Sequence, residues 1–245
     1  MTDMLAPELA DIGATYRADA EVGSPSIAER TINERTFGIR AADIAEHRNS
    51  ASMLISKMYA WRGYTGNHQV GCDPNRITLT ASEKNGQTIG TLSLGIDSSV
   101  GLLADQVFRD CVDRYRHGSR RVCEITKLAI DPSVKSKAVL ASLFHVAFLY
   151  ARNLHDCSEI FIEVNPRHRR FYQSMLNFSV EAETRDNPRV QAPAVLLRAN
   201  TDYGADQIAQ RGGRSDNPGD DRSLFPFFFS QREEEGILNR LRDIG

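Results

Sequence analysis

The fold is decided by the stretch RRVCEITKLAID (120–131), which is predicted to form a strand. The stretch KAVLASLFHVAFLYARNLH (137–155) follows it and carries apolar residues at helical spacing on more than one side. A short apolar strand, EIFIEV, is expected at 159–164. PRHRRFYQSML (166–176) is expected to form a helix, because Pro166 suits a first helical turn. The chain therefore has a strand–helix–strand–helix unit at its centre.

The elements on either side of this unit complete a mixed pattern of strands and helices. The dipeptide Asn85-Gly86 is the strongest short hairpin signal, because both residue types tolerate a positive φ. Further strands are expected at 35–43, 76–83, 87–96, near 178–184 and at 193–199, and further helices at 44–60 and 102–117. This order predicts an α/β or α+β fold in which a mixed sheet is flanked by helices on both faces.

The composition excludes several classes of protein. Of the 245 residues, 41% are hydrophobic and 25% are charged, which is typical of a globular protein with a real core. A net charge of −2 argues against nucleic-acid binding by bulk charge. No apolar run approaches the roughly 20 residues of a membrane-spanning helix, and the acidic start does not resemble a signal peptide. A cytoplasmic location is therefore expected.

The cysteines and histidines predict no metal centre. The four cysteines are widely scattered and form no C-x-x-C pair, so free and mostly buried thiols are expected rather than disulfides or a zinc site. The histidines do not show metal-ligand spacing either. We therefore expect the chemistry to come from side chains and backbone groups.

Three parts of the chain differ in character. Residues 1–34 mix acids with Gly, Pro and Ser and are expected to form a poorly ordered N-terminal arm. The patterned region at 35–200 is expected to be the main domain. Residues 201–245 are expected to form a linker and an amphipathic helix.

The C-terminal part carries two further signals. Ser230 and Glu233 form a capping box, which predicts the start of a helix whose apolar face includes Ile237 and Leu241. The stretch FPFFF (225–229) favours a tail that folds back and covers an edge of the domain, because apolar clusters are usually buried. A tail that binds a partner is the alternative.

Two features resemble the GNAT acyltransferase superfamily. NPRHRRFY (165–172), which runs on to LNF (176–178), is similar to the helix of that superfamily's fourth motif, with its N-terminal Asn, its Tyr and its terminal Gly-Phe. The element order matches the superfamily's fold from about 35 to 199. The resemblance implies an acyl-donor cleft between the strands at 120–131 and 159–164, with the donor's phosphates held by the loop and helix that follow the first strand.

The phosphate-binding loop departs from the superfamily pattern Arg/Gln-x-x-Gly-x-Gly/Ala. Asp131-Pro132 and Lys135 stand where expected, but Ala138 and Leu140 occupy the glycine positions. Leucine adds bulk where a pyrophosphate presses against the backbone, whereas the helix N-terminus still suits a single phosphate. The expected donor is thus the acyl-phosphopantetheine of an acyl carrier protein, with no permanently bound cofactor; a CoA enzyme with a degenerate loop is the alternative. The resemblance places these residues at the donor: Leu128, Ile130, Lys135, Lys137, Ala138, Asn165 and Arg169.

The segment CEITKLAID (123–131) is similar to the Glu-x-Ser/Thr-Arg-Phe/Leu-Ala-Val segment of acyl-homoserine-lactone synthases. It is closer still to long-chain N-acyl amino acid synthases of the FeeM type. The resemblance implies transfer of an acyl group from acyl carrier protein to the α-amine of an amino acid. Lys127 replaces the Arg of the lactone synthases and cannot make its planar two-point contact with a carboxylate. A CoA-dependent N-acetyltransferase and a non-catalytic module that binds acyl carriers are the alternatives.

Acylation of an amine needs a proton acceptor, because only the neutral amine attacks the thioester. We predict that Glu124 accepts this proton; pairing with an arginine, such as Arg121 or one from a neighbouring strand, is the alternative. Period-two alternation puts Lys127 on the opposite face, so both side chains meet one cleft only if the strand bulges between them. Without a bulge, Lys127 is a solvated lysine. Tyr172 is a candidate to protonate the leaving thiolate, or else packs as an ordinary helix tyrosine.

The remaining candidates concern the acceptor, the acyl chain and the carrier protein. Arg62 and Tyr64 are expected to border the acceptor pocket, although Arg62 also fits a surface turn. Phe144 is among the apolar residues expected to line the acyl chain. Basic clusters at 114–121 and 167–170, with Lys135 and Lys137 between them, favour docking of an acidic carrier protein, or else are solvated basic faces.

Overall fold

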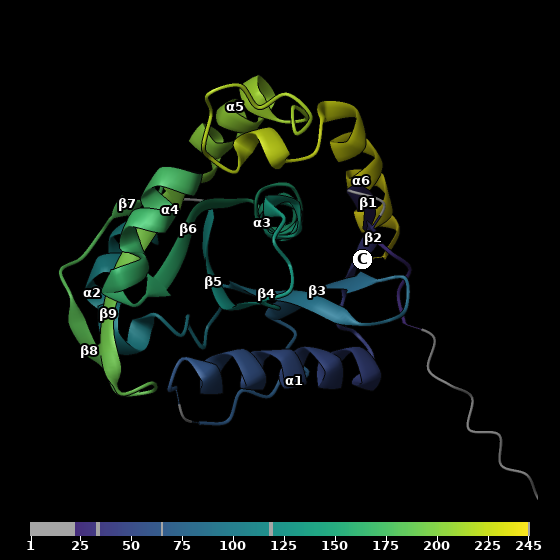
Figure 1. The fold of residues 1–245 in the computed structure, drawn as a ribbon. Helices are drawn as coiled ribbons and strands as arrows, with labels where there is room; N and C mark the ends of the chain where they lie inside the picture. Colours follow the sequence, from purple (N-terminus) through teal and green to yellow (C-terminus); the bar gives the residue numbers. More distant parts are fainter. Residues whose placement is uncertain (1–22, 33–34, 65, 118–119, 245) are drawn as a thin grey trace, which may run out of the picture.

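The structure is a computed structural model that describes residues 23–32, 35–64, 66–117 and 120–244. Its centre is one sheet with the strand order β1-β2-β3-β4-β5-β6-β9-β7, in which β8 also pairs with β9 (Figure 1). The strands are β1 (Ala28–Ile32), β2 (Arg35–Ala41), β3 (Arg76–Glu83), β4 (Thr88–Ile96), β5 (Arg121–Ile130), β6 (Cys157–Val164), β7 (Ser179–Val180), β8 (Arg185–Asn187) and β9 (Ala192–Asn200). β5 and β6 pair in parallel, and the other neighbouring strands are antiparallel.

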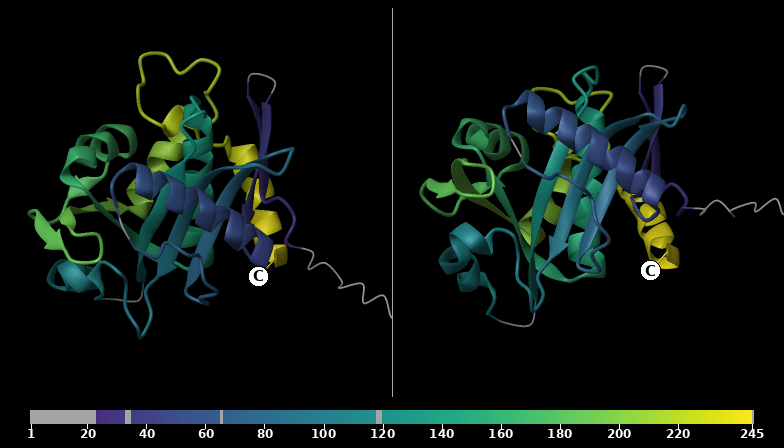
Figure 2. Two further views of the ribbon diagram at one scale, coloured as in Figure 1. Left: turned by 60° about the horizontal axis from the view of Figure 1, so that its bottom comes forward. Right: turned by 90° about the horizontal axis from the view of Figure 1, so that it is seen from below.

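Helices cover both faces of this sheet, as the sequence predicts. α3 (Lys137–Leu149) lies on one face and α1 (Ala45–Trp61) crosses the other (Figures 1 and 2). α3 also makes the crossover that the parallel pair of β5 and β6 requires. The other α-helices are α2 (Asp105–Val112), α4 (Arg169–Leu176), α5 (Thr201–Arg211) and α6 (Gln231–Ile244).

α3 is buried on nearly all sides. From Ala138 to Leu149 every side chain except that of Leu140 is buried, which confirms the prediction made from its wide apolar face. The C-terminal part of the chain covers the side of α3 that faces away from the sheet, and Phe225, Phe228 and Phe229 are all buried there. The interpretation that this aromatic stretch folds back on the domain is therefore confirmed.

β5 and β6 diverge halfway along their length. Their ladder ends at the pair Ile125 and Ile162, although β5 continues to Ile130 and β6 to Val164. On its other side, β5 breaks register with β4, and Lys127 in the break has a φ of 51°. This break is a β-bulge at Lys127, and it allows the side chains of both Glu124 and Lys127 to reach one cleft.

The bulge shifts the alternation of β5 by one residue. Before it, Val122 packs with Phe108 of α2 in one apolar cluster. After it, Ala129 packs with Ile55 of α1, whereas Leu128 packs with the core that contains α3. In a straight strand, Leu128 would share a face with Val122. Here the two side chains lie on opposite faces of the sheet.

Most boundaries match the sequence predictions within a few residues. The Asn85-Gly86 hairpin is confirmed, with Gly86 at φ 85° and its N–H bonded to the Glu83 carbonyl. The capping box at the start of α6 is also confirmed, since the Glu233 carboxylate accepts from Ser230 N at 2.7 Å and the Glu233 N–H donates to Ser230 Oγ. Cys111, Cys123 and Cys157 are buried free thiols, and Cys72 is an exposed one.

Three elements differ from the sequence predictions. Beyond the single strand expected near 178–184, where β7 lies, the structure has the separate strand β8. Within the expected N-terminal arm at 1–34, residues 28–32 form β1, because pairing with β2 satisfies the backbone of a segment whose own pattern is weak; residues 1–22 lie outside the described part of the chain. α5 was not predicted at all, although Asn200 caps it by accepting from Tyr203 N at 3.0 Å. Within the described residues, no helix combines the length and apolarity needed to cross a membrane.

Candidate functional site

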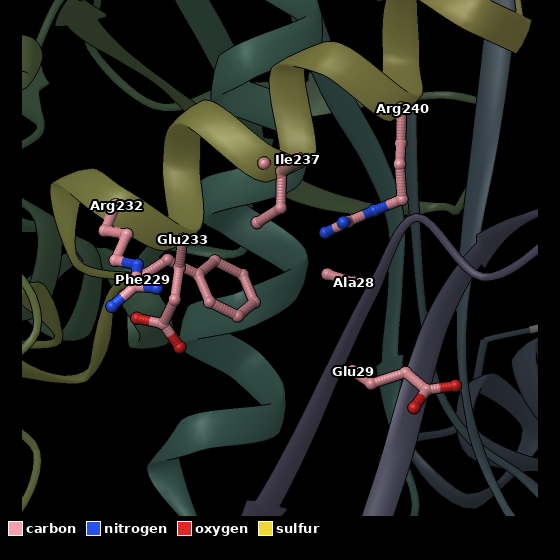
Figure 3. A pocket seen from close by; sticks show the side chains of 8 residues that line it. Ala28, Glu29, Phe229, Arg232, Glu233, Ile237 and Arg240 are labelled. Carbon is pink, nitrogen blue, oxygen red and sulfur yellow. The ribbon is translucent and has the colours of Figure 1, made fainter.

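The described residues form two cavities that are candidate sites. One, of about 430 Å³, lies between β1 and α6; its lining includes Glu29 of the strand and Arg232, Glu233 and Arg240 of the helix (Figure 3). Arg240 there already donates to the carbonyl of Ile27, at the contact between the C-terminal helix and the sheet. The other, of about 590 Å³, opens at the divergence of β5 and β6 and is called the cleft cavity below.

The cleft cavity gathers most of the residues predicted from the sequence. Its lining includes Glu124, Lys127, Leu128, Ile130, Asn165, Tyr172, Arg62 and Tyr64. Five predicted residues lie outside the lining: Lys135, Lys137, Ala138, Arg169 and Phe144. Side chains from segments far apart in the sequence therefore meet where the sheet opens; the lining comes from 59–68, 103, 124–130, 140, 162–172 and 187–194.

Glu124 is almost completely buried and fully engaged. Its Oε1 accepts from Arg76 Nη2 at 3.1 Å and from Leu103 N at 2.9 Å, and its Oε2 accepts from Ala104 N at 3.0 Å. Only 3% of its side chain is exposed. Glu124 therefore forms an ion pair with an arginine of another strand, Arg76. Pairing with an arginine is the alternative that the sequence left open. Its role as proton acceptor stays a prediction.

The strand register explains how Arg76 reaches Glu124 across β4. Arg76 on β3 stands opposite Gly95 on β4, and Gly95 stands opposite Glu124 on β5. A Cβ atom at Gly95 would lie 3.2 Å from both Arg76 Nη2 and Glu124 Oε1. The absence of a side chain at this position therefore makes room for the ion pair.

Lys127 is half-buried at the bulge and shares the cavity with Glu124. Its Nζ donates to the backbone carbonyl of Gln69, which lies in the segment between α1 and β3. Burial, and secondarily the positive charge of Arg76, lower the pKa of Lys127. No ion pair joins it to a carboxylate within the described part of the chain.

The aromatic side of the cavity is formed by tyrosines. Tyr172 is buried among the rings of Phe144, Phe171 and Phe178, and burial raises its pKa, so its phenol keeps its proton. Burial also raises the pKa of Tyr59 to about 12. Phe144 lies behind Tyr172, with its ring centroid 6.4 Å away, rather than in the lining.

The start of α3 carries the residues predicted at the donor phosphate. Ser136 Oγ accepts from Ala138 N at 3.2 Å and so caps the helix. Lys137 points to the C-terminal segment, where its Nζ donates to the Arg222 carbonyl at 2.7 Å and lies 5.5 Å from the Phe227 ring. Lys135 is exposed, and Leu140 projects into the cleft cavity.

The segment that leads into α4 carries Asn165 and Arg169. Asn165 Oδ1 accepts from Arg167 N at 3.2 Å and caps the short helical turn Pro166–His168. Arg169 is exposed, and its Nε donates to Gln173 Oε1 at 3.3 Å. Asn165 thus borders the cavity, whereas Arg169 belongs to the outer surface.

The end of α1 and the residues after it also border the cavity, next to the segment that leads into α4. Arg62 is exposed, stacks 5.7 Å from the Trp61 ring and donates to the Met58 carbonyl. The Tyr64 hydroxyl lies 3.5 Å from Arg167 Nη2. Both residues line the cavity. Arg62 also lies in a turn at the surface, which is the alternative given for it in the sequence analysis.

Sequence reasoning missed a second buried carboxylate in the cavity. Glu163 of β6 is 9% exposed; its Oε2 accepts from Arg189 Nη2 at 2.6 Å, and its Oε1 accepts from Asn187 Nδ2. Burial raises the pKa of Glu163, while Arg189 and Asn187 oppose this effect. The available signal was a glutamate after the apolar run Ile160-Phe161-Ile162 of the strand EIFIEV. No comparable signal marked Arg189, which lies in the turn between β8 and β9.

Two imidazoles complete the titratable lining of the cavity. Burial lowers the pKa of both His68 and His168, so the neutral forms prevail near pH 7. Among the described residues, no group of three or more His, Cys, Asp or Glu is arranged to hold a metal ion. The groups in the lining are thus suited to proton transfer and to binding charged or acyl groups.

The comparisons identify the family. The model of the family "N-acyl amino acid synthase FeeM" matches residues 50–200, which is more than half of the chain. The chain belongs to the FeeM family of N-acyl amino acid synthases. It is therefore an acyltransferase, and the resemblance given by its motifs is confirmed. No curated protein matches the sequence.

Solved structures show the same fold. The structure of FeeM, an N-acyl amino acid synthase from uncultured soil microbes, matches with a TM-score of 0.60 and 21% identity, covering 70% of this chain and 94% of that chain. The AHL synthase LasI matches with a TM-score of 0.50 and 14% identity, covering 71% of this chain and 91% of that chain. The GNAT acyltransferase fold expected from the motifs is confirmed, and the FeeM-family match covers both diverging strands.

Proposed function

We propose that this FeeM-family enzyme transfers an acyl group from the phosphopantetheine thioester of an acyl carrier protein to the α-amine of an amino acid. The main support is the cleft cavity, which opens where the ladder between β5 and β6 ends at Ile125 and Ile162. A gap between two central strands admits a slender thioester arm from one face of the sheet and an amine from the other. The family match supports the class of product.

The start of α3 favours a donor with one phosphate. A helix N-terminus attracts an anion through its free N–H groups. Here Ser136 already binds the N–H of Ala138, Lys137 is held by the Arg222 carbonyl, and Leu140 adds bulk toward the cavity. Lys135 remains exposed beside the helix start. These contacts leave more room for the single phosphodiester of phosphopantetheine than for the pyrophosphate of CoA.

The reaction itself is an aminolysis of a thioester. The acceptor ammonium loses one proton, the free amine attacks the carbonyl carbon, and the resulting oxyanion is stabilised by a backbone N–H at the bulge near Leu128, where the β4–β5 ladder is interrupted. The C–S bond then breaks, and the thiolate takes the second proton from nitrogen. Tyr172, whose phenol keeps its proton, is a second donor for this thiolate. The products are an N-acyl amino acid, a thiol and one proton.

The charges of the cavity provide a place for the carboxylate of the amino acid. Glu124 is paired with Arg76 and Glu163 with Arg189, so both carboxylates of the lining have a cation. Lys127 instead donates to a backbone carbonyl. Its ammonium, like the guanidinium of Arg62 at the entrance, is thus a cation that an incoming α-carboxylate reaches without breaking an ion pair given for the described residues.

Basic side chains near the cavity support the carrier as donor. Arg167, Arg169 and Arg170 are exposed at the start of α4, next to the lining residues Asn165 and His168. Carrier proteins are acidic, and complementary charge accelerates and orients docking. The acyl arm of a carrier docked there enters the cavity beside Asn165.

The proposal is tested by identification of the product. The purified full chain is incubated with a mixture of the common amino acids and either an acyl-loaded acyl carrier protein or the matching acyl-CoA, and products are read by mass spectrometry. We expect N-acyl amino acids from the carrier donor. Acylation of amines other than amino acids, or no product from either donor, would contradict the proposal.

A further inference from the structure

The cleft cavity holds two carboxylates, and their hydrogen-bond partners are of different kinds. Within the described part of the lining, these carboxylates are Glu124 and Glu163. Amine acylation requires a proton acceptor inside this space, because the α-amine arrives mainly as an ammonium at neutral pH. Their hydrogen-bond partners distinguish the two candidates.

Most of the hydrogen-bond donors to Glu124 are backbone groups, which have no rotamers. Two of its three donors are the backbone N–H groups of Leu103 and Ala104, which lie just before α2, and the third is the guanidinium of Arg76. The two backbone donors cannot change rotamer, so they hold the carboxylate of Glu124 in one position. Protonation of Glu124 would force at least one of these donors to lose its acceptor inside the protein.

Glu163 is bound by side chains only. Each of its oxygens accepts one hydrogen bond, from Asn187 Nδ2 and from Arg189 Nη2. Asn187 Oδ1 also accepts from Arg189 N at 2.8 Å, so the turn after β8 presents both donors together. Arg189 is 30% exposed, so its guanidinium can turn toward solvent when Glu163 takes up a proton.

The position of Glu163 also suits the amine rather than the thioester arm. It follows Ile162, the last residue of β6 that pairs with β5, so it stands where the gap begins. Alternation along β6 puts it on the same face as Phe161, which packs with Phe108 of α2. α3, whose N-terminus suits the donor phosphate, lies on the opposite face (Figure 1).

Building on the proposed function, we infer that Glu163 accepts the proton of the acceptor ammonium and that Arg189 is the positioning residue that holds it. The proton moves from nitrogen to a Glu163 oxygen, the amine forms the C–N bond, the C–S bond breaks and the second N–H proton goes to the thiolate. Glu163 then returns its proton to solvent. No oxidant, metal or further reactant is needed.

The electrostatics of the cavity agree with this role. Burial raises the pKa of Glu163, the negative charge of Glu124 across the gap adds to this effect, and Arg189 and Asn187 oppose it. A raised pKa brings a carboxylate closer to the operating pH, where general bases are most effective. The other titratable or charged groups in the lining are Tyr59, Arg62, Tyr64, His68, Lys127, His168 and Tyr172.

The decisive experiment compares pH–rate profiles of matched variants on an acyl-loaded carrier protein and the amino acid that the wild type uses. Glu163→Gln should lower kcat at pH 7 by about a hundredfold or more, and its remaining rate should rise about tenfold per pH unit as free amine accumulates. Arg189→Met should move the acid limb to higher pH, because loss of the positive charge raises the pKa of Glu163 further. Arg189→Lys, which keeps the charge, should shift the limb less.

Glu124→Gln is the matched control. It should keep an acid limb, moved to lower pH because loss of the Glu124 charge lowers the pKa of Glu163, whatever it does to the rate. Thermal unfolding of every variant shows which of them remain folded. The inference is overturned if Glu163→Gln loses less than about threefold in kcat and keeps the wild-type pH profile, or if Glu124→Gln alone removes the acid limb. The proposed function fails separately, if the wild type itself makes no N-acyl amino acid.

Discussion

Opposite walls of the cleft cavity hold their carboxylates differently. On the β5 wall, Glu124 is fixed by two backbone N–H groups and by Arg76, which reaches across β4. On the β6 wall, Glu163 is held by the side chains of Asn187 and Arg189 alone. Backbone donors move only when a loop moves, whereas side-chain donors change rotamer. The Glu124 carboxylate is therefore held in one position, whereas the donors of Glu163 are able to move away from it.

The strongest test of this contrast removes the cation from each wall in turn. Arg76→Met leaves the 3%-exposed Glu124 without its countercharge and should cost about 3 kcal/mol of unfolding free energy. Arg189→Met removes a more exposed guanidinium and should cost about 1 kcal/mol. Urea unfolding of both variants measures the two losses. Equal losses would show that the walls do not differ in the way described.

Much of this contrast follows from local sequence patterns, and much does not. The apolar spacing in 137–155 and the Asn85-Gly86 turn depend on near neighbours, so the sequence predicts them. The bulge at Lys127 was required by the chemistry, but its presence was not evident from the pattern. The main elements of the fold were therefore predictable, whereas β1 and α5 were missed because their own patterns are weak and tertiary contacts decide them.

The site was only half predictable for the same physical reason. Eight of the predicted residues line the cleft cavity because they lie on or next to the diverging strands. Arg76 was missed because its contact with Glu124 depends on the register of three strands. Arg189 was missed because a short turn places it beside Glu163 of β6. Lys137 lies outside the cavity because its Nζ donates to the Arg222 carbonyl, 85 residues further along the chain.

A smaller effect is expected from crowding the β5 wall. Gly95→Ala places a methyl group 3.2 Å from atoms of both Arg76 and Glu124 and should push the pair apart, at a cost of about 1–2 kcal/mol. Gly71→Ala is the matched control, because nothing lies within 4 Å of the added carbon and its φ is not positive. Unfolding midpoints measure both. An unchanged unfolding midpoint for Gly95→Ala would mean that the added methyl group does not disturb the Arg76–Glu124 pair.

The surface outside both walls should affect only the delivery of the donor. Reversal of two exposed charges in Arg169→Glu/Arg170→Glu should lower kcat/KM for an acyl-loaded carrier protein by about tenfold at low salt, and by less as salt screens the charges. The same variant should use a small acyl-pantetheine donor at the wild-type rate. An equal loss of kcat/KM with both donors would show that these arginines act in the catalytic site and not in docking of the carrier protein.

The central claim is tested most directly by the donor preference of the wild-type enzyme. kcat/KM is measured for one acyl chain presented on acyl carrier protein and on CoA, with the same amino acid acceptor. We predict a preference for the carrier of at least about tenfold, since charge complementarity favours its docking and the capped, leucine-crowded start of α3 disfavours a pyrophosphate. Equal or better use of acyl-CoA would contradict the account.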